Sequence, residues 1–80
     1  MKPGHPRWDE FVRRLEGPEG VNMRQGPGGQ PVWDCSSTYL GAAAVLARMG
    51  LTAGDVEASF KYFRSRGGHC DCEILLNVAS

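Results

Sequence analysis

The chain has 80 residues, with nine basic and nine acidic side chains and a formal net charge of zero. A core of this size supplies only about 3–5 kcal/mol, so chains of this length often gain stability from a metal ion, a partner or disulfides. A neutral charge balance argues against nonspecific nucleic-acid binding, which needs a basic surface. Because the apolar runs are too short to span a bilayer, we also expect no membrane partner.

The cysteine count bears on the compartment. Three cysteines cannot all pair within one chain, and no apolar stretch follows the N-terminal residues. Both features favour a reducing compartment over secretion, and we expect a cytoplasmic protein.

The N-terminal half predicts a helix followed by a hairpin. Residues 1–6 are expected to form a flexible arm, and residues 7–80 a single domain. Hydrophobic side chains at helical spacing then predict a helix that ends at Gly17-Pro18, because a residue before proline avoids the helical region. Next, Gly26-Pro27-Gly28-Gly29 separates two short extended segments, residues 20–25 and 31–34, and predicts a β-hairpin. The residues of the helical pattern are Trp8, Phe11, Val12 and Leu15.

Two further helices are expected in the second half. One runs to about Met49 and is capped by Ser36, Ser37 or Thr38. The other begins after Thr52, with Asp55 at its third position, and ends at Gly67-Gly68. Its predicted buried residues are Val56, Ser59, Phe60 and Phe63.

The last segment alternates in character. Even positions 70 to 78 hold Cys, Cys, Ile, Leu and Val, which predicts a strand with one apolar face. The expected fold is therefore α+β, in the order α-β-β-α-α-β. It is a small three-stranded antiparallel sheet, formed by the hairpin and the last strand, with helices packed on one face.

The ending Gly67-Gly68-His69-Cys70-Asp71-Cys72-Glu73, followed by Ile74-Leu75-Leu76-Asn77-Val78, resembles a small bacterial family known only as a domain of unknown function. A cysteine just ahead of a helix, here in Trp33-Asp34-Cys35, is a second shared feature. Many relatives carry a histidine near that cysteine, where this chain has Ser36 and Ser37. The resemblance supports the fold and the choice of site, and implies no reaction.

The cysteines form the candidate site. If the last strand lies beside the hairpin, the thiols of Cys35, Cys70 and Cys72 converge. Zinc prefers four sulfur or imidazole ligands, and His69 or His5 would complete the set. Two alternatives stay open. The thiols are simply buried, as free cysteines often are, or Cys35, ahead of a helix N-terminus, takes part in redox chemistry.

A polar surface is also expected, with Asp71, Glu73 and Asn77 on the exposed face of the last strand and Arg24 beside them. An ordinary cross-strand ion pair explains such a set better than acid–base catalysis does. We therefore expect a non-catalytic module that binds a protein partner or a second copy of itself, because the hairpin leaves a free sheet edge. The alternative is a zinc-binding or thiol-redox protein that uses the three cysteines.

Overall fold

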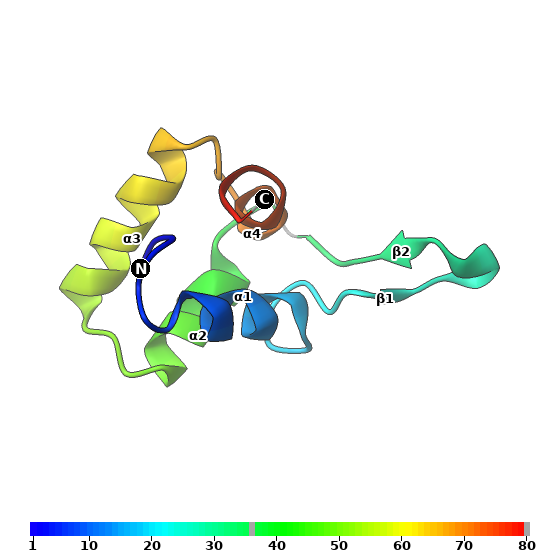
Figure 1. Cartoon of the computed structure of the whole chain (residues 1–80), viewed down its shortest axis with the longest axis horizontal. Helices are drawn as coiled ribbons and strands as arrows, with labels where there is room; N and C mark the ends of the chain where they lie inside the picture. Colours follow the sequence, from blue (N-terminus) through cyan, green and yellow to red (C-terminus); the bar gives the residue numbers. More distant parts are fainter. Residues whose placement is uncertain (36, 80) are drawn as a thin grey trace.

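The computed structural model describes residues 1–35 and 37–79. Figure 1 shows a body of helices from which a hairpin projects, and this hairpin gives the molecule its long axis, at 41 × 23 × 23 Å. None of the described helices has the length and apolar character needed to cross a bilayer. The elements, in chain order, are α1 (Trp8–Glu16), β1 (Arg24–Gln25), the 3-10 turn η1 (Pro27–Gly29), β2 (Pro31–Val32), α2 (Leu40–Arg48), α3 (Ala53–Ser65), α4 (Asp71–Glu73) and the π-helical turn η2 (Ile74–Val78).

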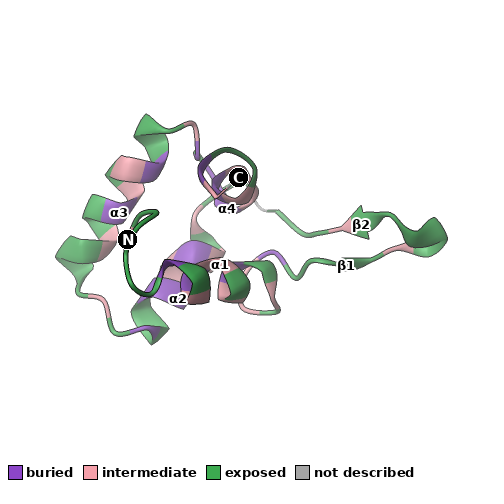
Figure 2. Cartoon of the chain, in the orientation of Figure 1, coloured by how far each residue is buried: buried purple, intermediate pink, exposed green. Residues whose placement is uncertain are grey.

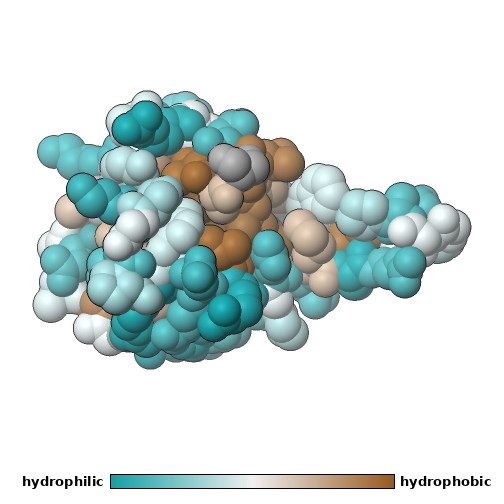
Figure 3. Space-filling model, in the orientation of Figure 1, coloured by the Kyte–Doolittle hydropathy of each residue, from teal (hydrophilic) through white to brown (hydrophobic). Residues whose placement is uncertain are grey.

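Helix α2 is the centre of the body, because α1, α3 and α4 all pack against it. Its alanine-rich sequence lets these neighbours approach closely, and it buries Ala42, Val45 and Leu46. Figure 2 shows that the buried residues gather in the helical body, while the hairpin is largely exposed. In Figure 3 the hydrophobic residues likewise gather on the body, and the hairpin is mostly hydrophilic. The stability of the domain therefore comes from packing between helices.

Helix α1 follows the predicted pattern closely. Trp8, Phe11 and Leu15 are buried, and Val12 is partly buried against the same core. The ring of Phe11 stacks on that of Phe63 from α3, with centroids 5.7 Å apart. Aromatic pairs at this separation add to the free energy gained by burying their surface.

The predicted start of α3 is confirmed. The hydroxyl of Thr52 accepts a hydrogen bond from the backbone N–H of Asp55 at 3.2 Å, as an N-cap does. Ser59 and Phe63 are buried, whereas Val56 and Phe60 are only partly buried. Gly67, with φ of +83°, follows the helix in the left-handed conformation that glycine adopts most easily.

The hairpin has the predicted turn but shorter strands. Strands β1 and β2 are antiparallel, with Arg24 opposite Val32, and they form the one sheet seen in the described residues, with two strands. The hairpin projects from the helices instead of forming a layer beneath them (Figure 1). An α+β content is therefore present, but the expected three-stranded sheet with helices on one face is wrong.

The last segment is helical, so the predicted final strand is wrong. Cys70, Ile74 and Val78 are buried, as predicted, but they are spaced by four residues. That spacing places side chains on one face of a helix and equally on one face of a strand. Only positions 72 and 76 distinguish the two, because a strand would place them on the buried face and a helix would not. Leu76 is 59% exposed, which fits the helix. Acidic residues in the first turn favour this helix through its dipole.

The start of α2 differs in part from the expected cap. The N-cap residue of α2 is Tyr39, although the hydroxyl of Thr38 does accept a hydrogen bond from the N–H of Leu40 at 3.2 Å. The cap proposed for Ser36 lies outside the described residues.

At the N-terminus, the ammonium group of Met1 donates to the hydroxyl of Ser59 at 2.8 Å, which places the first residue against α3. A flexible arm over residues 1–6 stays a prediction.

Candidate functional site

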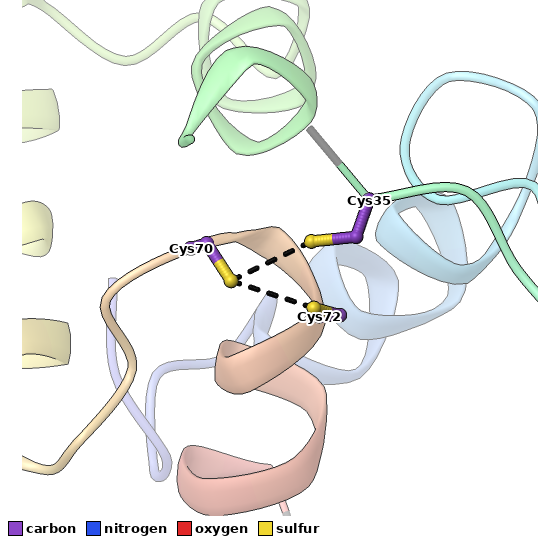
Figure 4. A group of neighbouring side chains, drawn as sticks. All are labelled: Cys35, Cys70 and Cys72. Carbon is purple, nitrogen blue, oxygen red and sulfur yellow. Dashed lines mark hydrogen bonds between the residues drawn. The ribbon is translucent and has the colours of Figure 1, made fainter. Parts of the chain in front are cut away.

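Three cysteine thiols meet beside the start of α4. The sulfur atoms of Cys35 and Cys70 lie 3.5 Å apart, and those of Cys70 and Cys72 lie 3.4 Å apart. All three lie within 4.8 Å of one another. Figure 4 shows their side chains converging from two segments, with Cys35 on one side and Cys70 and Cys72 on the other. The sequence places these segments 35 residues apart, and the fold brings their sulfur atoms into contact.

Backbone hydrogen bonds hold these segments in place. The N–H of Asp34 donates to the carbonyl of the buried Val21 at 2.7 Å, which fixes the chain just before Cys35. On the other side, the N–H of Asp71 donates to the carbonyl of Thr38 at 2.9 Å. Each cysteine-bearing segment is thus anchored by a neighbouring residue, and the thiols need not supply the attachment themselves.

Asp71 connects the cysteines to the central helix. Its carboxylate accepts hydrogen bonds from the N–H groups of Gly41, at 2.8 Å, and Ala42, at 3.0 Å. These N–H groups belong to the first turn of α2 and have no partner within the helix. Asp71 therefore caps α2 from a distance of 30 residues along the chain. Its two neighbours in sequence, Cys70 and Cys72, are thereby positioned against the start of α2.

Glycine at position 41 makes this contact possible. A Cβ atom there would lie 2.7 Å from an Asp71 carboxylate oxygen and 2.9 Å from the Cα atom of Gly20. Both approaches are closer than real Cβ contacts allow. Only glycine lets the carboxylate and the loop after α1 approach the helix so closely.

The thiols of Cys35 and Cys72 differ in pKa. Burial raises the pKa of Cys35, but hydrogen bonds from the Cys72 thiol, from the backbone of Ser37 and Cys72, and from the Cys70 thiol outweigh it and leave the pKa lowered. Burial, together with the thiols of Cys35 and Cys70, raises the pKa of Cys72 to about 12. Of these two thiols Cys35 is therefore the more acidic, and it is also the exposed thiol of the cluster.

A groove of about 500 Å³ lies next to the cluster. Cys35 and Asp71 line it on one side, and the loop after α1, including Glu19, lines it on another. Glu19 is held there by Arg14 at 2.7 Å and by Arg48 of α2 at 3.3 Å. The cluster is thus reachable from the surface through the neighbourhood of Cys35.

The structure brings together three of the four residues predicted to hold a metal ion. Among the described residues, the group of potential ligands comprises Cys35, Cys70 and Cys72, without His69. The side chain of His69 is not in this group, and its backbone N–H donates to the carboxylate of Glu73 at 3.0 Å. His5 is exposed, and its ring accepts a hydrogen bond from the N–H of Arg7.

The four residues of the expected polar surface do not gather. Asp71 is buried, and the side-chain amide of Asn77 donates to the carbonyl of Gly67 at 2.8 Å. Arg24 lies on the hairpin and pairs with Asp34 at 3.3 Å. This expectation depended on the last segment being a strand, and in a helix residue 71 lies on a different face from residues 73 and 77.

Sequence reasoning missed two polar contacts that frame the site. It did not assign the cap of α2 to Asp71, because nothing local links residue 71 to residues 41 and 42. It also missed the hydroxyl of Tyr39, which donates to the carbonyl of Gly68 and joins the start of α2 to the loop before Cys70. The available signal was the absence of a good capping residue at Tyr39 itself.

The fold and the site define a small, mainly helical domain with a projecting hairpin and a cluster of three cysteines. A family model described as Protein of unknown function (DUF2695) matches residues 31–77, more than half of the chain. The chain therefore belongs to this family, which confirms the resemblance to a domain of unknown function. The match spans β2, α2, α3 and all three cysteines. No match was found among curated proteins or among solved structures.

Proposed function

We propose that this domain is a zinc-binding module in which Cys35, Cys70 and Cys72 hold the ion. The observation that carries the proposal is the meeting of three sulfur atoms within 4.8 Å. In a tetrahedral site with zinc–sulfur bonds of about 2.3 Å, neighbouring sulfur atoms lie about 3.8 Å apart. The two shortest separations here, 3.5 and 3.4 Å, are within a few tenths of an ångström of that value.

The ion would serve a structural role. It would join the segment before α2 to the start of α4, two parts of the chain that are distant in sequence. Binding energy at such a site adds directly to folding stability, which matters for a core as small as this one. The fourth position on zinc would be filled by water or by a donor from outside the cluster.

The test is to measure metal content and affinity in the full chain. Protein purified without chelators is expected to contain one zinc ion per chain by elemental analysis and native mass spectrometry. Cobalt substitution is expected to give the intense sulfur-to-cobalt absorption of a thiolate site. Because bound ligand stabilises the native state, removing the metal with a chelator is expected to lower Tm.

Cys35→Ser is the most informative variant, because Cys35 is exposed and its loss leaves the core intact. We expect it to weaken zinc binding by more than the roughly 10–100-fold that loss of a supporting residue causes. His69→Asn is the matched control and is expected to bind zinc like the unmodified chain. Zinc binding that survives Cys35→Ser, or no zinc binding by the folded chain, would contradict the proposal.

A second candidate function is thiol redox chemistry, and the 3.5 Å separation of the Cys35 and Cys70 sulfur atoms favours it. A small movement would bring them to the disulfide bond length of about 2.05 Å. A peroxide would accept two electrons and leave as water and alcohol, while both thiols lose their protons. Oxidised protein would then show one remaining thiol and a mass lower by two hydrogen atoms, and three free thiols after mild peroxide treatment would exclude this chemistry.

Association with a protein partner or a second copy stays a prediction. It is supported by two exposed hydrophobic side chains on the helical body, Leu40 at 73% and Leu76 at 59% exposure. Light scattering over a range of concentrations tests self-association, and a constant monomer mass would argue against a homodimer.

A further inference from the structure

The cluster has three sulfur donors and no fourth ligand among the histidine, cysteine and carboxylate groups that the structure describes. The carboxylates next to the cysteines in sequence make other hydrogen bonds. One oxygen of Glu73 accepts from the N–H of His69. Both oxygens of Asp71 accept hydrogen bonds from the start of α2, and both oxygens of Asp34 accept from Arg24. The described donor set therefore suits an ion that needs three soft ligands, whereas zinc must recruit a fourth.

The two shortest sulfur separations are also compatible with such an ion. An ion about 2.3 Å from each sulfur, the length of a zinc–thiolate bond, would subtend angles of about 95–100° across separations of 3.4 and 3.5 Å. These angles are narrower than the tetrahedral value. Narrow angles are typical of a pyramidal ion whose fourth position is occupied by its own lone pair.

Charge gives a further argument. Zinc bound by three thiolates carries a net negative charge, and the residues next to the cysteines in sequence, Asp34, Asp71 and Glu73, are acidic. A trivalent ion bound by the same three thiolates is neutral. Since burying charge near like charge is costly, the neutral complex suits this environment better.

We propose that Cys35, Cys70 and Cys72 form a binding site for a trivalent thiophilic ion of the arsenic or antimony type, taken up as its neutral hydroxide. The inference rests on the proposed function, because it uses the same three thiols. Three arsenic–oxygen bonds break and three arsenic–sulfur bonds form. Each thiol proton leaves with a hydroxide as water, so three water molecules are released. No electrons are transferred, and no other reactant is needed.

The structure also supplies a route of entry. Cys35 is exposed and lines the groove of about 500 Å³ beside the cluster, while Cys70 is buried. The ion would therefore meet Cys35 first and then exchange its remaining hydroxides for the two thiols at the start of α4.

The experiment is a titration of the reduced, metal-free full chain with arsenite. Thiols are counted with a chromogenic reagent and the product by native mass spectrometry. We expect one arsenic per chain and the loss of all three free thiols. In a parallel titration of zinc-loaded protein, we expect arsenite to displace the zinc. Cys35→Ser leaves only the pair Cys70 and Cys72, and we expect its affinity to fall by at least about 100-fold, because the third bond is intramolecular. His69→Asn is expected to behave like the unmodified chain.

The outcomes separate this inference from the zinc proposal. Zinc binding without arsenite binding, or arsenite that leaves one thiol free, would overturn the inference and leave the zinc site standing. Arsenite binding without zinc binding would support the inference and remove the zinc proposal. If neither ion binds the folded chain, both proposals fail. An equal arsenite affinity in Cys35→Ser would also overturn the inference.

Discussion

Asp71 caps α2 through Gly41, whose backbone N–H lies 2.8 Å from the Asp71 carboxylate. This contact joins the segment between two cysteines to the helix at the centre of the body. The geometry of the cysteine cluster and the stability of α2 therefore depend on each other.

Asp71→Ala is expected to destabilise the domain. It leaves the N–H groups of Gly41 and Ala42 without this hydrogen-bond acceptor, and loss of a helix N-cap costs about 0.5–2 kcal/mol. Because the contact is buried, the unsatisfied N–H groups add to this cost. A loss of about 2 kcal/mol corresponds to a fall in Tm of roughly 8–16 °C for a domain of this size. Asp71→Asn should lose less, because its amide oxygen can still accept a hydrogen bond.

The control for this pair is Glu57→Gln, which changes an exposed carboxylate on α3. We expect its stability to stay within about 0.5 kcal/mol of the unmodified chain. Urea denaturation of the metal-free proteins gives the free energy of unfolding of all three variants. If Asp71→Ala unfolded at the same urea concentration as Glu57→Gln, the capping role would be refuted.

Gly41→Ala is expected to destabilise the chain, although alanine is the better helix former by up to about 1 kcal/mol. The new Cβ atom would lie 2.7 Å from an Asp71 oxygen, so the carboxylate has to withdraw. Gly54→Ala is the matched control in α3, where the nearest atom would be 3.9 Å away. Thermal unfolding should show a lower Tm for the first variant and an equal or higher Tm for the second. A change in Tm of the same sign for both variants would show that crowding at Gly41 is unimportant.

The structure of the last segment can be tested by comparing Ile74→Ala with Leu76→Ala. In a strand these side chains share one face, and both changes would remove core packing. In the helix Ile74 is fully buried and Leu76 is 59% exposed. We therefore expect Ile74→Ala to cost about 2–5 kcal/mol and Leu76→Ala less than about 0.5 kcal/mol. Equal costs in urea denaturation would favour the strand.

This segment also shows how far the sequence could predict the molecule. The hydrophobic spacing of α1, the cap of α3 and the glycine-rich hairpin turn are local signals, and the structure has all three. The hydrophobic spacing of the last segment could not predict its structure, because a spacing of four fits a strand and a helix equally. The buried residues at this spacing are Cys70, Ile74 and Val78. The cluster of cysteines was expected from a third strand, and in the residues that the structure describes the sheet has two strands. The thiols meet because Asp71 binds the start of α2, a contact between distant residues that no local pattern reveals.

Glu19 predicts how the domain responds to acid. A hydrogen bond from Arg14 lowers the pKa of Glu19, and a hydrogen bond from Arg48 lowers it further. Together they outweigh burial, which raises the pKa. A lowered pKa means that the ionised form stabilises the native state above the unfolded-state pKa of about 4.3. This stabilisation is lost as the pH falls through the lower, folded-state pKa. Glu19→Gln lacks the ionisable group and should lose less stability between neutral pH and about pH 3.

Urea denaturation of metal-free protein at the two pH values measures the difference, with Glu57→Gln as the control for removing one carboxylate. Because Glu19 joins the loop after α1 to Arg48 of α2 beside the groove, the variant should also loosen that wall. Faster reaction of Cys35 with a thiol reagent would report this change, since Cys35 lines the same groove. Parallel pH profiles for the unmodified chain and Glu19→Gln would show that the ion pairs of Glu19 do not stabilise the fold.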